Sequence, residues 1–372
     1  MPESIARMSN EPEEDTGHSQ ESVFPPEKAR VPTEELLSRH KYQLRPRYQE
    51  NALSSWDPER NRDMDSRGLE DHTRQKTSTA LVVAIHEPSG QLVCIKGVQS
   101  SLQEHRILQQ FTDHPGHSQN HCVPLLDVFQ DPDDPEVTYM VMPYLHPINK
   151  PPFVTVGEVM DFVGQMLEGL DFLHTHGVAH RNGDISNVMM DANALLRRYH
   201  AMNADSNPTA DHPAQILPRH RAGIRYYFVD FGLAMHVEHP RSVNKYVVGP
   251  CGKNRMVPEF SSSGPYDVFK ADVYILGNLF REAFYKEYSN VEWLCPLIDM
   301  MTKVDPEDRP HAWQAEKFWS LNVASYRLDP STVLIERMFK QTLWNSDLVR
   351  QALLSRPAVL GGRLLGWFAQ QG

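Results

Sequence analysis

Cysteine is scarce in this chain of 372 residues, which contains only four. Cys94, Cys122, Cys251 and Cys295 are widely spaced, and no two of them form a Cys-x-x-Cys pair. Disulfide scaffolds and zinc modules place their cysteines in close, recurring pairs. The sequence therefore indicates neither a disulfide framework nor a zinc site, and no His-Glu-x-x-His motif appears among its 18 histidines.

Long apolar runs and a basic surplus are missing as well. No apolar stretch reaches the roughly 18 residues that cross a bilayer, and the acidic first fifteen residues do not resemble a signal peptide. The formal net charge of −11 argues against nucleic acid or an anionic membrane as the main partner. We therefore expect an intracellular, cytoplasmic protein with neither of these partners, and its oligomeric state stays open.

The first part of the chain has strand patterns. Residues 1–33 are polar and charged, which predicts a disordered leader. The next segment, 34–145, begins with a short amphipathic extension. It continues with two arms rich in Val, Ile and Leu over 80–98, joined by a turn that contains Pro88 and Gly90. This pattern predicts a β-hairpin.

The second part of the chain has helix patterns. Apolar positions recur at steps of three and four in the segment 146–320, which is interrupted by a polar inserted loop at 195–224. Residues 321–372 form a tail, in which we expect one further helix over 333–343. Strands followed by helices predict an α+β fold with a small antiparallel-sheet lobe and a larger helical lobe.

Two residues in the first lobe have the chemistry that phosphate binding needs. Lys96 ends the second arm of the hairpin, and Glu104 follows eight residues later in a helix-like segment. Phosphoryl transfer from ATP requires a cation on the phosphates, and an ion pair with a helix carboxylate would aim this ammonium group.

The second lobe supplies candidate metal ligands. The segment "HRNGDISN" is close to the kinase catalytic loop H-R-D-x-x-x-x-N and places Asn187 at the metal-binding amide. Downstream, "VDFG" follows an apolar strand and places Asp230 where a carboxylate could hold magnesium. Three structural residues follow at the spacing of a kinase framework: Glu259 in "VPE", Asp272 in "ADVYILG" and Arg309 in "DPEDRP".

Together these motifs resemble the eukaryotic protein kinase domain over residues 80–320. Over 34–320, segments such as "NHCVPLLDVF" and "HGVAHR…NVMMD" look like a lineage-expanded kinase-like family of mushroom-forming fungi. The resemblance implies ATP and Mg²⁺ as cofactors and a protein with Ser or Thr hydroxyls as the substrate.

The resemblance also implies roles for residues around the adenine pocket. Met142 would guard the back of this pocket, and the three residues Pro143, Tyr144 and Leu145 would form the hinge. It further implies an apolar spine of four stacked side chains, which are those of Leu108, Leu126, His180 and Phe231.

Two departures from the kinase pattern put catalysis in doubt. Asn182 stands where a kinase has its catalytic Asp, and an amide cannot take the proton of the substrate. Asp184, two residues later, could substitute in part or be an ordinary turn residue. The stretch 71–80 contains no glycine, although a Gly-rich loop covers the phosphates in kinases.

We therefore expect a kinase-like domain that binds ATP and Mg²⁺, with weak or impaired phosphotransfer. The main alternative is an inactive pseudokinase that acts as a scaffold or switch. A small-molecule phosphotransferase is disfavoured, because the residue five positions after Asp184 is Met189 rather than the Asn that such enzymes carry.

Overall fold

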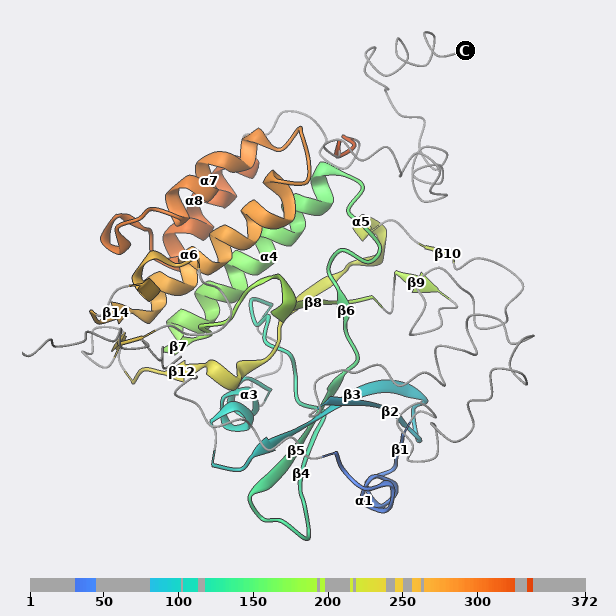
Figure 1. Ribbon diagram of the computed structural model, residues 1–372. Helices are drawn as coiled ribbons and strands as arrows, with labels where there is room; N and C mark the ends of the chain where they lie inside the picture. The colour runs from blue at the N-terminus through green and yellow to red at the C-terminus, as the bar shows by residue number, and fades with distance from the viewer. Residues whose placement is uncertain are drawn as a thin grey trace, which may run out of the picture.

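The structure is a computed structural model that describes eleven segments of the chain, namely residues 31–44, 81–101, 103–112, 118–192, 195–197, 215–216, 219–238, 245–249, 256–261, 264–324 and 333–336. A curled antiparallel sheet with helix α3 forms one lobe, and the helices α4, α6, α7 and α8 form the other (Figure 1). The predicted α+β, two-lobed kinase-like fold is confirmed.

The sheet of the small lobe has five strands in the order β1-β2-β3-β5-β4. The hairpin predicted over 80–98 is confirmed as the pair β2–β3, in which Lys96 lies opposite Leu81. On its other side β3 pairs with β5, where Lys96 lies opposite Met140. The strand bounds are β1 (Tyr42–Leu44), β2 (Leu81–His86), β3 (Gln91–Gln99), β4 (Asp127–Gln130) and β5 (Val137–Pro143).

The two faces of this sheet have different neighbours. Alternate residues of β3 point to opposite faces, so Val93 and Ile95 belong to one apolar cluster and Lys96 lies on the other face. Helix α1 (Glu34–Arg39) buries Leu36 and Leu37 in that cluster. The opposite face looks toward α3 (Glu104–Thr112) and the helical lobe (Figure 1).

Helix α4 (Val156–Thr175) is the 20-residue centre of the large lobe. Its first turn is fixed by a capping box, in which the Thr155 side chain accepts from the Glu158 amide and Glu158 accepts from the Thr155 amide. Around α4 pack the helices α6 (Val268–Phe280), η7 (Arg281–Tyr285), α7 (Cys295–Met301) and α8 (Ala312–Ala324). Every residue of α6 is buried, as expected for a helix at the middle of a lobe.

The other described strands are short and form four small sheets. The three strands β6 (His146–Pro147), β8 (Val188–Asp191) and β11 (Arg225–Phe228) form one small sheet. The remaining strands form three pairs, which are β7 (Val178–Ala179) with β12 (Met235–His236), β9 (Leu196–Arg197) with β10 (Gln215–Ile216), and β13 (Tyr246–Val247) with β14 (Tyr266–Asp267).

The described end of the inserted segment is packed against the large lobe. Helix α5 (Arg219–Ala222) begins with Arg219, whose guanidinium donates to the carbonyls of Ile148 and Pro151 and to the Tyr226 hydroxyl. The same group lies 4.1 Å from the centre of the Phe153 ring. These contacts tie the insertion to the chain between the hinge and α4.

The described part of the tail is extended, so the helix expected over 333–343 is wrong at its first four residues. Val333 accepts from the Val156 amide, and the Ile335 amide donates to Val154, because the start of α4 offers backbone partners there. Residues 337–343 lie outside the described residues. Within the described part of the chain, no helix is long and apolar enough to cross a membrane.

Two glycines of α4 allow a matched test of this packing. A Cβ on Gly169 would lie 2.6 Å from the Cβ of His121, whereas a Cβ on Gly164 would lie 3.4 Å from Nε1 of Trp319. Alanine raises helix stability by about 1 kcal/mol at either position. We expect Gly164→Ala to be neutral or stabilising and Gly169→Ala to lower the free energy of unfolding by roughly 1–3 kcal/mol, as measured by urea unfolding. Equal effects of the two changes would contradict this packing.

Candidate active site

Lys96 is the centre of an ion cluster between the lobes. Its Nζ lies 2.9 Å from both carboxylate oxygens of Glu104 and 2.7 Å from Oδ1 of Asp230. Strand β3, helix α3 and the loop after β11 each supply one member. The structure thus brings together the predicted Lys96–Glu104 pair and adds Asp230 to it.

The three charges of this cluster stabilise one another. Burial alone would lower the pKa of Lys96, but the carboxylates of Glu104 and Asp230 outweigh it and raise this pKa well above its usual value. Burial would raise the pKa of Asp230, and Lys96 overcomes that effect and lowers it. The lysine is therefore a fixed cation. The Asp230 side chain is 44% exposed, which leaves it open to a further ligand.

Asp230 has a left-handed backbone, with φ of 61° and ψ of 70°. This conformation costs about 1 kcal/mol or more for a residue with a Cβ, and such residues cluster at functional sites. It occurs directly before the short helical turn η4 (Phe231–Leu233). Phe231 is buried and meets the ring of His180 edge-on, with centroids 4.7 Å apart.

Asp272 of α6 fixes the backbone of the predicted catalytic loop. One carboxylate oxygen accepts from the His180 amide at 2.7 Å and the other from the Arg181 amide at 2.6 Å. The His174 ring lies 3.2 Å from the same carboxylate. Arg181 has a positive φ of 64°, so the loop turns sharply there. Asp272 therefore determines the position of the next residue, Asn182.

His180 sets the start of the loop through both of its ring nitrogens. Its Nδ1 accepts from the Asn182 amide, so the ring donates from Nε2 to the Val229 carbonyl at 3.1 Å. Burial lowers the pKa of His180, which keeps this ring neutral. The loop and the strand that leads to Asp230 are thereby linked through one side chain.

Asn182 and Asn187 are neighbours through a side-chain contact. The Asn187 amide group donates to the Asn182 carbonyl at 2.8 Å, and the Asn187 carbonyl accepts from Val229 at 3.0 Å. Asn182 is buried, and within the described part of the chain its Oδ1 has no hydrogen-bond partner. A buried amide oxygen without a partner is costly, and such groups occur at functional sites.

Asp184 has a local structural contact. Its carboxylate accepts from the amide of Ser186 at 2.9 Å and from the Ser186 hydroxyl at 2.6 Å, and so caps the helical turn η3 (Ile185–Asn187). These bonds fit the interpretation of Asp184 as a turn residue. Its catalytic role stays a prediction.

The predicted hinge residues lie at the end of β5 and just beyond it. Met142 is buried, lies opposite Cys94 in β3, and belongs to the core that includes Leu108 and Phe231. Pro143 ends β5, and Tyr144 and Leu145 follow it. Cys94 was not predicted from the sequence to lie beside Met142, although the two-residue period of a strand puts it on the same face as Lys96. Burial raises the pKa of Cys94 to about 12, so its thiol stays neutral.

The predicted apolar spine needs one correction. Leu126 is 52% exposed, so its place in the spine is wrong, whereas Leu125 is 6% exposed and belongs to the core with Leu108 and Phe231. The Leu126 amide bonds to the Val141 carbonyl, and this contact at the start of β4 turns its side chain outward. The glycine-free stretch 71–80, in contrast, lies outside the described residues.

The framework residues predicted for the large lobe are in contact. Arg309 donates to both carboxylate oxygens of Glu259 at 2.7 Å, and also to the carbonyls of Lys270, Lys303 and Val304. This bidentate pair is buried, with Arg309 almost fully enclosed. A fully bonded buried pair fixes the segment around Glu259 on the helical lobe.

Two described side chains offer oxygen donors to a metal ion at this site. Among the described residues, no group of three or more His, Cys, Asp or Glu side chains could hold a metal ion. Asp230 offers an exposed carboxylate, and no described group donates to Oδ1 of Asn187. These two oxygen donors fit Mg²⁺, which usually completes its coordination with water and substrate phosphates.

Comparison with known proteins agrees with this geometry. The family model of the protein kinase domain matches residues 77–292, which is more than half of the chain. No curated protein gave a significant match.

The buried ion pair allows a stability test. The side chain of Glu104 is 1% exposed, so Lys96→Met leaves its carboxylate buried without its cation. Removing one partner of a buried pair costs roughly 3–5 kcal/mol, whereas replacing both with apolar residues can be neutral. We expect the double variant Lys96→Met/Glu104→Met to be more stable in urea than Lys96→Met alone. A double variant that is less stable than Lys96→Met would contradict the pairing.

Proposed function

This chain belongs to the protein kinase domain family, and we propose that it binds ATP with Mg²⁺ and transfers the γ-phosphoryl group weakly. The observation that carries this proposal is the Lys96 cluster, in which one ammonium group contacts Glu104 and Asp230 at 2.7–2.9 Å. This assembled set of charges is what a kinase needs before nucleotide arrives.

The nucleotide would lie against residues from both lobes. In this proposal Lys96 contacts the phosphates, and Met142, Pro143, Tyr144 and Leu145 line the adenine side. Asp230 and Asn187 would hold Mg²⁺, which neutralises charge on the phosphates as transfer proceeds. The buried Glu104 keeps the lysine in place, because its two oxygens both accept from Nζ.

Asn182 is the reason to expect slow transfer. Its Oδ1 has no partner within the described part of the chain and can accept a hydrogen bond from a substrate hydroxyl. An amide oxygen does not take the proton, however, and general-base catalysis contributes roughly 10²–10⁴-fold. The residue therefore orients a hydroxyl group without activating it.

The proposed substrate is a Ser or Thr hydroxyl of a cytoplasmic protein. The finer family assignment also belongs to this proposal: the sequence likeness supports a lineage-expanded, fungal kinase-like family. A second candidate function follows from Asn182, namely a pseudokinase whose lobes close on nucleotide to present a surface to a protein partner.

Nucleotide binding is tested by thermal shift. We expect millimolar ATP with Mg²⁺ to raise the melting temperature, because a ligand that binds only the folded state stabilises it. Lys96→Ala and Asp230→Ala should abolish the rise, and Lys286→Ala, a change at an exposed lysine paired with Glu282, should keep it. An absent shift in the unaltered chain would sink the proposal of a nucleotide site.

Phosphoryl transfer is tested by restoring the missing carboxylate. We expect Asn182→Asp to raise transfer from ATP to a Ser/Thr-containing protein substrate by roughly 10²-fold or more. Asp184→Ala tests the turn residue, and an unchanged transfer rate would assign it to η3 alone. If neither the unaltered chain nor Asn182→Asp transfers phosphate while ATP still binds, the pseudokinase function holds instead.

A further inference from the structure

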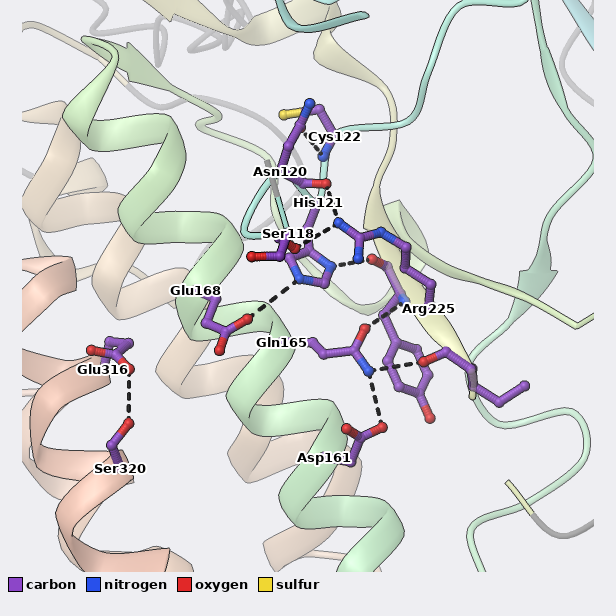
Figure 2. Close-up of polar contacts among 12 residues, drawn as sticks. Ser118, Asn120, His121, Cys122, Asp161, Gln165, Glu168, Arg225, Glu316 and Ser320 are labelled. Atoms are coloured by element: carbon purple, nitrogen blue, oxygen red, sulfur yellow. Dashed lines mark hydrogen bonds and ion pairs between the residues drawn. The ribbon is translucent and has the colours of Figure 1, made fainter. Parts of the chain in front are cut away.

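A pocket of about 580 Å³ lies between α4, β11 and the loop that precedes Cys122. None of its lining residues belongs to the Lys96 cluster or to the catalytic loop. Figure 2 shows one side of it, where Asp161, Gln165 and Glu168 project from α4 toward Arg225. Its volume lies within the roughly 300–1,000 Å³ of small-molecule sites.

The α4 side of the pocket is acidic. Asp161 and Glu168 are seven residues apart, so they lie on one face of the helix about two turns from each other. Burial raises the pKa of Asp161, and burial together with the charge of Glu316 raises that of Glu168. A third carboxylate, that of Glu158, is already used to cap α4.

The opposite side of the pocket is basic. Arg219 begins α5 and Arg225 begins β11, and both line the cavity. Arg225 donates to the carbonyls of Ser118 and Asn120, as Figure 2 shows. Arg219 donates to two carbonyls and a phenol oxygen. Neither guanidinium forms an ion pair with a carboxylate anywhere in the described residues.

Arg219 is the more deeply buried of the two arginines. Arg219 is only 5% exposed, and its Nε has no hydrogen-bond partner among the described residues. The Asp161 carboxylate attracts this guanidinium across the pocket, but a buried donor without a hydrogen-bond partner is still costly. A ligand carboxylate in the pocket would supply an acceptor for this Nε.

The polar residues between the two sides add no charge of their own. Gln165 donates to Asp161 and to the Ile224 carbonyl and accepts from the Tyr226 amide, so its amide is fully used. The pKa of His121 is about 4 because of burial, so this ring is neutral near pH 7. Its Nε2 lies 3.8 Å from the Glu168 carboxylate, but the neutral ring offers that carboxylate no positive charge.

We propose that this pocket binds a small zwitterion, of the size of an amino acid or a dipeptide. Its ammonium group would pair with Asp161 and Glu168, and its carboxylate would pair with Arg219 and Arg225. A zwitterion matches the charges of both sides of the pocket, whereas a purely anionic or purely cationic ligand would match only one. The inserted segment 195–224 supplies Arg219, Gly223 and Ile224 to the lining, so the proposal gives this insertion a function.

The test uses the full chain without nucleotide, so its result is independent of ATP binding. The probes are the twenty L-amino acids and their glycyl dipeptides at millimolar concentration, with melting temperature as the first readout. Each compound that raises it is then titrated by calorimetry, together with its N-acetylated and C-amidated forms. The variants are Asp161→Asn, Arg225→Gln and, as a matched control on the surface of α7, Asp299→Asn.

We expect at least one zwitterion to bind, and its Kd to rise about tenfold or more in Asp161→Asn and in Arg225→Gln, since each loses a charge-assisted contact. The control Asp299→Asn should bind like the unaltered chain, and blocking either end of the ligand should weaken binding to a similar degree. The proposal is overturned if no probe raises the melting temperature, if both pocket variants keep full affinity, or if the blocked forms bind equally well.

Discussion

The ion cluster of Lys96 is the interaction on which the site depends. Strand β3, helix α3 and the loop after β11 each contribute one charged side chain to it. Because Lys96 and Glu104 are buried, neither charge is tolerated alone. The pair therefore fixes α3 against the sheet, and its contact with Asp230 connects the small lobe to the large one. The Asp230 side chain stays 44% exposed in this contact.

In the large lobe, the contacts that hold the predicted catalytic loop are present, although residue 182 in this loop is Asn. Asp272 holds the amides of His180 and Arg181, and Asn187 bonds back to the Asn182 carbonyl. These contacts position residue 182 whether it is Asp or Asn, because they use the backbone. A framework that is intact around an uncharged residue is consistent with nucleotide binding and slow chemistry, and it makes a single substitution an informative test.

Much of this arrangement could be predicted from the sequence, because kinase motifs are local and ordered. The hairpin, the Lys96–Glu104 pair and the Glu259–Arg309 pair follow from spacing and residue type. The errors have tertiary causes. Leu125 and Leu126 are adjacent and equally apolar, and only the backbone hydrogen bond from Leu126 to Val141 decides which of them is buried. The tail at Val333 has helical spacing, but the start of α4 offers it backbone partners. The charged pocket escaped prediction because it joins α4 to residues about sixty positions later.

We have proposed that Lys96, Asp230 and Asn187 form a site for ATP with Mg²⁺. This proposal is tested most directly by calorimetric titration of ATP into the full chain, first with Mg²⁺ and then with excess chelator. We expect saturable binding with Mg²⁺ that weakens at least tenfold when the metal is removed, because in this proposal Asp230 and Asn187 would contact the nucleotide through it. Binding that is equally tight without Mg²⁺, or no binding under either condition, would contradict the account.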